Sequence, residues 1–146
     1  MIWAGLAFLA LFVSSVLFVA LCGTRWERMG IGVVFVGSLA TLVVAAIEAQ
    51  DWTTTVYSVL FVDLTGLLAF GYIALRSDRF WPLWVTGMQL AQLTTHMAKM
   101  ASPSIVPKAY ENGLAVWSWL QILVIVLATW HLRQKAQRAK AAKPKF

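Results

Sequence analysis

Residues 80–100 read FWPLWVTGMQLAQLTTHMAKM, and this stretch decides how many times the chain crosses a membrane. Its length suits a helix that spans about 30 Å of hydrocarbon, yet its glutamines, threonines and histidine make it the least apolar such stretch in the sequence. Gln89, Gln92, His96 and Lys99 recur at a spacing that places them along one face of a helix. Because lipid leaves polar groups unpaired, we predict a fourth transmembrane helix whose polar face meets other helices, a wet cavity or a partner subunit.

Four further apolar stretches of similar length flank this one, at residues 2–22, 29–49, 54–75 and 113–132. The chain of 146 residues is 60% hydrophobic and only 12% charged, a composition that excludes an ordinary soluble domain. Short polar separators force consecutive helices to run antiparallel, and one longer loop carries Pro103 and Pro107. We therefore predict an all-α integral membrane protein, with a five-helix antiparallel bundle over residues 1–132 and a basic tail over residues 133–146.

The distribution of basic residues predicts the orientation of the bundle. With five spans, the four arginines of the separators and the six basic residues of the tail lie on one side, and only Lys99 and Lys108 lie on the other. Cytoplasmic segments carry the excess of Lys and Arg, so we expect the N-terminus outside and the tail in the cytoplasm. Without the fourth span, a four-helix chain with its N-terminus inside would have six basic residues on each side. The charge asymmetry therefore favours five spans, in a multi-pass protein of a bacterial-type inner membrane.

The eight tryptophans fall near the ends of the predicted spans, as in the aromatic belts of membrane proteins. Those expected at the outer boundary are Trp3, Trp52, Trp117 and Trp119, and those expected at the inner boundary are Trp26, Trp81, Trp84 and Trp130.

Asp63 lies near the middle of the third span, where an acidic side chain costs roughly 2.5 to 3.5 kcal/mol on insertion scales. Gly66, one turn further on, would let another helix approach. One interpretation is a neutral carboxyl that bonds a glutamine across a tight contact, and the other is a proton or cation relay. The helical rise places Gln89 at the depth of Asp63 and His96 about 9 Å further out, so we expect a glutamine partner and no basic residue at that depth.

Glu48 lies at the end of the second span, at about the depth of Lys99 in the fourth. An ion pair between them is available if the two helices are neighbours, with His96 just below it. The alternative is ordinary charge at the membrane boundary.

Several chemistries lack residues to support them. Cys22 is the only cysteine, so no internal disulfide can form, and the two histidines lie about 20 Å apart along the membrane normal, too far to ligate one haem. The sequence contains no HExxH, P-loop or GxSxG motif. We therefore expect no metal site, no cofactor and no catalytic residues. The missing motifs favour a role other than that of an enzyme, and a membrane enzyme is the third alternative after the two classes below.

The function remains open between two classes. The first is a structural or accessory subunit that uses the polar fourth-helix face for helix–helix contacts. The second is a small oligomeric transporter or channel for protons or cations, with Asp63, Gln89, Gln92 and His96 lining the path. The expected partners are the lipid bilayer, anionic headgroups bound by the tail, and a second copy or a larger membrane complex. Nucleic acid is not expected, because half of the basic charge is in the tail.

Overall fold

The computed structural model describes residues 2–47, 52–102, 104 and 106–142 and consists of five helices in these ranges. In chain order they are α1 (Ile2–Cys22), α2 (Arg25–Ile47), α3 (Trp52–Arg76), α4 (Trp81–Ala101) and α5 (Pro107–Ala141). Each of the five apolar stretches is a helix, which confirms the all-α prediction. The first helix has the predicted bounds, whereas α5 begins six residues earlier than expected and continues through the described part of the tail.

The helices α2 and α5 start earlier than the apolar pattern predicts, and each early start has a local cause. The backbone N–H of Thr24 donates to Oε2 of Glu27 at 3.0 Å, and the Thr24 hydroxyl also bonds that oxygen. The bond from the Thr24 N–H to the Glu27 carboxylate is one half of a Thr-x-x-Glu capping box, and α2 accordingly begins at Arg25 and not at residue 29. Pro107 lies in the first turn of α5, where a missing N–H does no harm, and therefore starts that helix within the predicted loop.

Three of the helices are long and apolar enough to cross a membrane, as judged over the described residues: Arg25–Ile47, Tyr57–Arg76 and Asn112–Ala141. The described side chains of α1 form a shorter apolar helix, Leu9–Cys22. These lengths and compositions suggest a multi-pass membrane protein. The prediction of five spans rests on α1 and α4 in addition, and remains a prediction.

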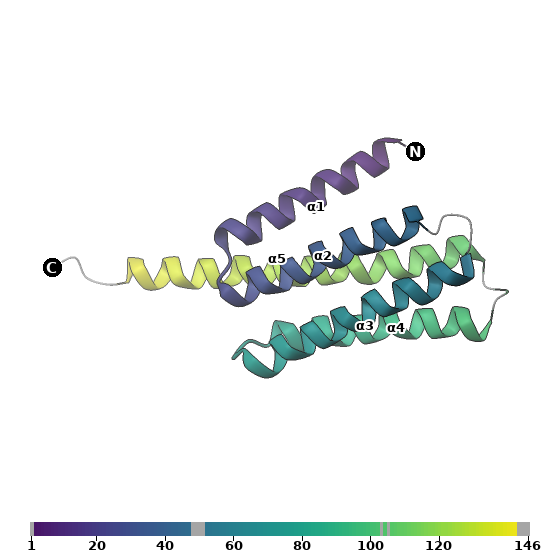
Figure 1. The fold of residues 1–146 in the computed structure, drawn as a ribbon. Coiled ribbons are helices and arrows are strands. Elements are labelled where there is room, and N and C mark those ends of the chain that lie inside the picture. Colours follow the sequence, from purple (N-terminus) through teal and green to yellow (C-terminus); the bar gives the residue numbers. More distant parts are fainter. Residues whose placement is uncertain (1, 48–51, 103, 105, 143–146) are drawn as a thin grey trace.

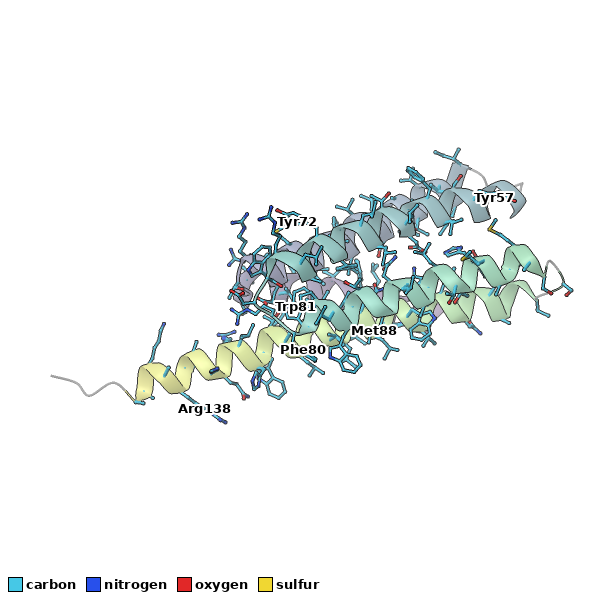
Figure 2. All side chains as sticks on the ribbon, turned by 90° about the horizontal axis from the view of Figure 1, so that it is seen from below. Tyr57, Tyr72, Phe80, Trp81, Met88 and Arg138 are labelled. Carbon is cyan, nitrogen blue, oxygen red and sulfur yellow. The ribbon has the colours of Figure 1, made fainter. Side chains whose placement is uncertain are left out.

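The helices form a bundle in which α1 and the α3–α4 pair lie on opposite outer sides (Figure 1). The helix α1 packs against α2 and α5, α2 packs against α3 and α5, and α4 packs against α3 and α5. With 35 residues, α5 is about 50 Å long, more than a bilayer core requires. Figure 2 shows Arg138 on the part of α5 that extends past the other helices.

An apolar core fills the half of the bundle in which α2 begins and α3 ends. Its fully buried members include Val19, Phe70, Val85 and Ile125, from four different helices. The opposite half contains the polar side chains of α4, so the two halves of the bundle differ in chemistry.

The structure corrects the prediction that Trp81 belongs to the inner aromatic belt. Its side chain is only 7% exposed, and its indole Nε1 donates to Oε1 of Glu27 at 3.0 Å. The ring lies over Gly30, where an added Cβ would be 2.5 Å from Trp81 Cη2. Trp84 and Trp130 are exposed, so they face the surroundings as a belt residue does. Trp81 is instead a core residue, because a buried carboxylate satisfies its N–H.

Candidate functional site

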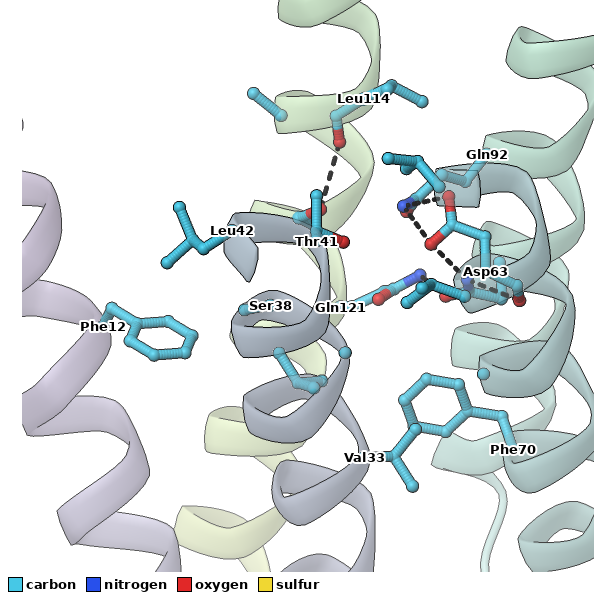
Figure 3. Close-up of a pocket in the computed structure, with 18 of the residues that line it drawn as sticks. Phe12, Val33, Ser38, Thr41, Leu42, Asp63, Phe70, Gln92, Leu114 and Gln121 are labelled. Carbon is cyan, nitrogen blue, oxygen red and sulfur yellow. Dashed lines mark hydrogen bonds between the residues drawn. The ribbon is translucent and has the colours of Figure 1, made fainter. Parts of the chain in front are cut away.

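A polar network centred on Asp63 joins α3, α4 and α5. Asp63 is 7% exposed, and its carboxyl group receives hydrogen bonds from the polar face of α4. Gln92 Nε2 lies 3.0 Å from both carboxyl oxygens, and Gln89 Nε2 lies 3.2 Å from Oδ1 and 3.1 Å from the Asp63 backbone oxygen (Figure 3). His96 Nε2 lies 2.7 Å from Oδ2. The structure therefore brings Asp63, Gln89, Gln92 and His96 together around one carboxyl group.

Gly66 allows the two helices to approach this closely. A Cβ at this position would lie 3.2 Å from Gln89 Nε2, so even an alanine would press on the amide that bonds Asp63. The prediction that Gly66 admits a neighbouring helix is confirmed.

Two residues of α5 complete the network, and neither was predicted. The hydroxyl of Tyr110 lies 2.7 Å from His96 Nδ1, and Gln121 Nε2 donates to Gln89 Oε1 at 2.7 Å. Gln121 could have been found, because it is an amide near the middle of an apolar span. Tyr110 precedes the predicted fifth span at residues 113–132, and the sequence signal for its helical position is Pro107, three residues earlier.

The contact between His96 and Asp63 contradicts the expectation that no basic residue lies at the depth of the carboxyl group. Side chains on a helix lean toward its N-terminus. Because α3 and α4 are antiparallel, Asp63 leans toward the start of α3 and His96 leans toward the start of α4, so the two side chains converge. Counting the rise of Cα atoms along each helix ignores this lean and placed His96 too far away.

Two arrangements of hydrogens satisfy the chain from Tyr110 to Asp63. In the first, the Tyr110 hydroxyl donates to His96 Nδ1, and Nε2–H donates to an ionised carboxylate. In the second, which holds one more proton, Nδ1–H donates to the tyrosine oxygen and a protonated carboxyl donates to Nε2. The network can therefore take up one proton when the Asp63 carboxyl is protonated and the hydrogen of the His96 ring moves from Nε2 to Nδ1. No heavy atom has to move.

Tyr110 precedes the apolar span Asn112–Ala141, at the end of the network. Burial raises the pKa of its phenol from 10.0 to about 12, and the negative charge of Asp63 adds to the shift. Tyr110 therefore keeps its proton at every physiological pH and can act as a hydrogen-bond donor to His96.

A cavity of about 320 Å³ borders the network between the five helices. Asp63, Gln89, Gln92 and Gln121 form one wall, and Ser38 and Thr41 of α2 lie in the opposite one (Figure 3). Gln92 Oε1 is buried and has no hydrogen-bond partner. This acceptor is enclosed by the protein next to the network, and the described groups leave it unsatisfied.

The remaining predicted site residues lie outside this network or outside the described part of the chain. Lys99 is half-buried one turn after His96, near the end of α4. Glu48 is outside the described residues, and so is the predicted ion pair between Glu48 and Lys99. Over the residues that the structure describes, no group of three or more His, Cys, Asp or Glu side chains is arranged to hold a metal ion.

Comparison of the chain with protein-family models, with curated proteins and with solved structures finds no match. Inference about function therefore rests on the site itself.

Proposed function

We propose that this chain is a small proton-linked membrane transporter with five transmembrane helices, its N-terminus outside and its tail in the cytoplasm. The observation that carries the proposal is the continuous hydrogen-bonded chain Tyr110–His96–Asp63 inside the bundle, with 2.7 Å between donor and acceptor at each step.

The first argument is electrostatic. With neutral His96, the hydrogen-bonded partners of Asp63 are all uncharged, so an ionised Asp63 leaves an uncompensated negative charge in this network. Removing an ion from water costs several kcal/mol even after relaxation, and one proton on Asp63 or His96 neutralises the charge. The network is thus suited to bind a single proton.

The second argument concerns the histidine. Imidazole can accept a proton on one nitrogen and release one from the other. Both nitrogens of His96 are engaged, one toward Tyr110 near the end of the bundle and one toward Asp63. A proton can therefore pass between the end of the bundle and its interior through this ring.

The alternative is a structural role, in which the network only holds helices together. It is favoured by one observation: the polar face of α4 is occupied by α3 and α5 of the same chain. The unpaired Gln92 Oε1 does not separate the two roles, because Ser77 Oγ, outside the network, is also buried without a partner. The protonation state of the network separates them.

The test is infrared difference spectroscopy of the purified protein between about pH 5 and pH 8. We expect the protonation state of the pair to change, with carboxyl or imidazole bands that are present in wild type and lost in Asp63→Asn. Asn can adopt the second hydrogen-bond arrangement, its amide donating to His96 Nε2, so this variant should fold. Glu27→Gln is the matched control, because Glu27 is the other carboxylate that is buried among the described residues, and its replacement should leave the bands in place.

Transport is tested in proteoliposomes that contain a pH-sensitive dye. If the network itself conducts protons, wild type and Glu27→Gln should dissipate an imposed pH gradient when charge is compensated, and Asp63→Asn and His96→Gln should not. A wild-type protein whose spectra and proton flux equal those of Asp63→Asn would contradict the proposal and leave the structural role.

A further inference from the structure

An apolar groove on the outside of the bundle, between α2 and α3, ends at a cluster of arginines. We propose that this groove binds one anionic phospholipid, with an acyl chain along the groove and the phosphate at the arginines. Both helices are among those long and apolar enough to cross a membrane, so the groove faces hydrocarbon. The inference goes beyond the proton-linked function and does not rest on it.

The groove is apolar and has about the length of one leaflet. It encloses about 600 Å³ and runs from Met29 to Ala40 on α2 and from Phe61 to Ile73 on α3. At 1.5 Å per residue each wall is about 16 to 18 Å long, and half of the hydrocarbon core of a bilayer is about 15 Å. The hydroxyl of Thr65, in the α3 wall, donates to the backbone oxygen of Phe61 at 2.9 Å. Because that hydroxyl is already bonded, the wall is suited to a hydrocarbon chain.

Small residues of α2 make room for this chain. Gly32, Gly37 and Ala40 line the groove, and a Cβ added at Gly32 or Gly37 would meet no atom within 4 Å. Glycine inside a helix lowers its stability relative to alanine. The space at these two positions is filled by no side chain of the described residues and is open to a group from outside the chain.

Three arginines continue the groove at one end. Arg25 and Arg28 each lie four residues before a groove-lining residue of α2 and so share its helix face. Arg76 lies one turn after Tyr72, which lines the groove, and its guanidinium carbon is 5.8 Å from the centre of that ring. Because α2 and α3 run antiparallel, the arginines of both helices gather at the same end (Figure 1). Figure 2 shows side chains with nitrogen tips beside Tyr72.

The arginines are accessible to an anion. All three side chains are exposed, and among the described residues no ion pair joins Arg25, Arg28 or Arg76 to a carboxylate. Glu27 is buried with both of its oxygens hydrogen-bonded, and Asp78, in the turn after α3, is exposed. Guanidinium groups bind phosphate through several N–H donors, and basic groups at the end of a membrane helix attract anionic headgroups. The groove thus has a site for a phosphate where its apolar part ends.

A second copy of the chain suits the groove less well. Two copies in one membrane have the same orientation, so pairing through this groove would bring the arginines of both copies to the same end. Like charges repel there, whereas a lipid phosphate neutralises them. The charge therefore favours a lipid over a helix of a second copy.

The probe lipids are phosphatidylglycerol and phosphatidylcholine with identical oleoyl chains, and their binding to the full chain in detergent is measured by native mass spectrometry. We expect the first phosphatidylglycerol to bind about tenfold more tightly, because its headgroup carries a net negative charge. The double variant Arg28→Gln/Arg76→Gln should remove this difference, and it should fold because both side chains are exposed. Arg138→Gln/Lys140→Gln is the matched control, since it removes the same charge from the exposed tail and should leave the difference unchanged.

Two glycine substitutions test the place of the acyl chain. Gly32→Leu should fill the groove and weaken the binding of phosphatidylglycerol about tenfold. Gly71→Leu is the matched control and should leave it unchanged, because Gly71 also has open space for a Cβ but does not line the groove.

Equal affinities for the two lipids, or a loss confined to the tail variant, would overturn the proposed site. Tight binding that survives Gly32→Leu would also overturn it, because the chain would then lie elsewhere. A wild-type dimer that Gly32→Leu dissociates and Gly71→Leu does not would assign the groove to a second copy. Asp63→Asn should bind phosphatidylglycerol as wild type does, so the lipid site and the proton-linked function are tested independently.

Discussion

His96 Nε2 lies 2.7 Å from Asp63 Oδ2, across 33 residues of sequence, and the other nitrogen of the same ring lies 2.7 Å from the hydroxyl of Tyr110. Both nitrogens of the histidine are therefore hydrogen-bonded, and the tautomer of the ring depends on whether the side chain at position 63 donates or accepts the hydrogen bond to Nε2.

This dependence predicts the tautomer of His96. With an ionised Asp63, Nε2 must carry the hydrogen, whereas in Asp63→Asn the amide donates to Nε2 and the hydrogen must lie on Nδ1. Nitrogen-15 NMR of histidine-labelled protein at about pH 8 should report a change of tautomer between the two proteins. His131 is exposed on the surface of α5, and its signal is the internal reference that should not change. An Nε2–H ring in Asp63→Asn would contradict the network described above.

The phenol of Tyr110 should lose its proton at a higher pH than an ordinary tyrosine does. Its pKa is raised to about 12 in the folded protein, against 10.0 in an unfolded chain. The unfolded chain loses this proton first, so the contribution of Tyr110 to stability is complete below about pH 10 and is lost as the pH rises through about 12. Absorbance of tyrosinate should show a component near pH 12 that is missing in Tyr110→Phe and present in Tyr72→Phe, whose ring is 51% exposed.

Alanine substitutions at two glycines of α3 should have opposite effects. At Gly71 a Cβ meets no atom within 4 Å, so Gly71→Ala should gain up to about 1 kcal/mol from helix propensity. At Gly66 the Cβ would lie 3.2 Å from Gln89 Nε2 and displace the amide that bonds Asp63. Thermal unfolding in detergent should give a lower midpoint for Gly66→Ala than for Gly71→Ala. Equal midpoints would mean that the contact between Gly66 and Gln89 can relax freely.

The hydrogen bond between Glu27 and Trp81 should make a measurable contribution to the stability of the apolar half. Both residues are buried, and Glu27→Leu leaves the indole N–H without an acceptor, at a cost of about 2 kcal/mol. Trp81→Phe removes the donor. A double-mutant cycle by denaturant unfolding should give a coupling energy of about 1.5 to 3 kcal/mol, as for hydrogen bonds to charged groups. Additive effects would contradict a direct bond in solution.

The topology prediction depends on α4. A reporter fused after Phe146 should report the cytoplasm, and one inserted after Lys108 should report the opposite side, because α5 separates the two positions. Reporters inserted after Ser77 and after Lys108 should also fall on opposite sides if α4 crosses the membrane. The same side for this second pair would remove the fourth span.

The sequence by itself determined the helices and one face of α4. Apolar length is a local property, and so is the spacing that aligns Gln89, Gln92 and His96, because 3.6 residues per turn bring such positions to one side wherever the helix is placed. The polarity of Asp63 and the small size of Gly66 likewise marked α3 as the place where another helix comes close.

Only the tertiary structure decided which groups meet. Whether His96 reaches Asp63 depends on the direction in which each side chain leans along two antiparallel helices, and whether Tyr110 and Gln121 join them depends on where α5 starts and how it is rotated. The burial of Trp81 also depends on tertiary packing, because its N–H can bond Glu27 only when α2 and α4 lie next to each other. Contacts across 26 to 54 residues of chain are set by the packing of whole helices, and no local pattern contains that packing.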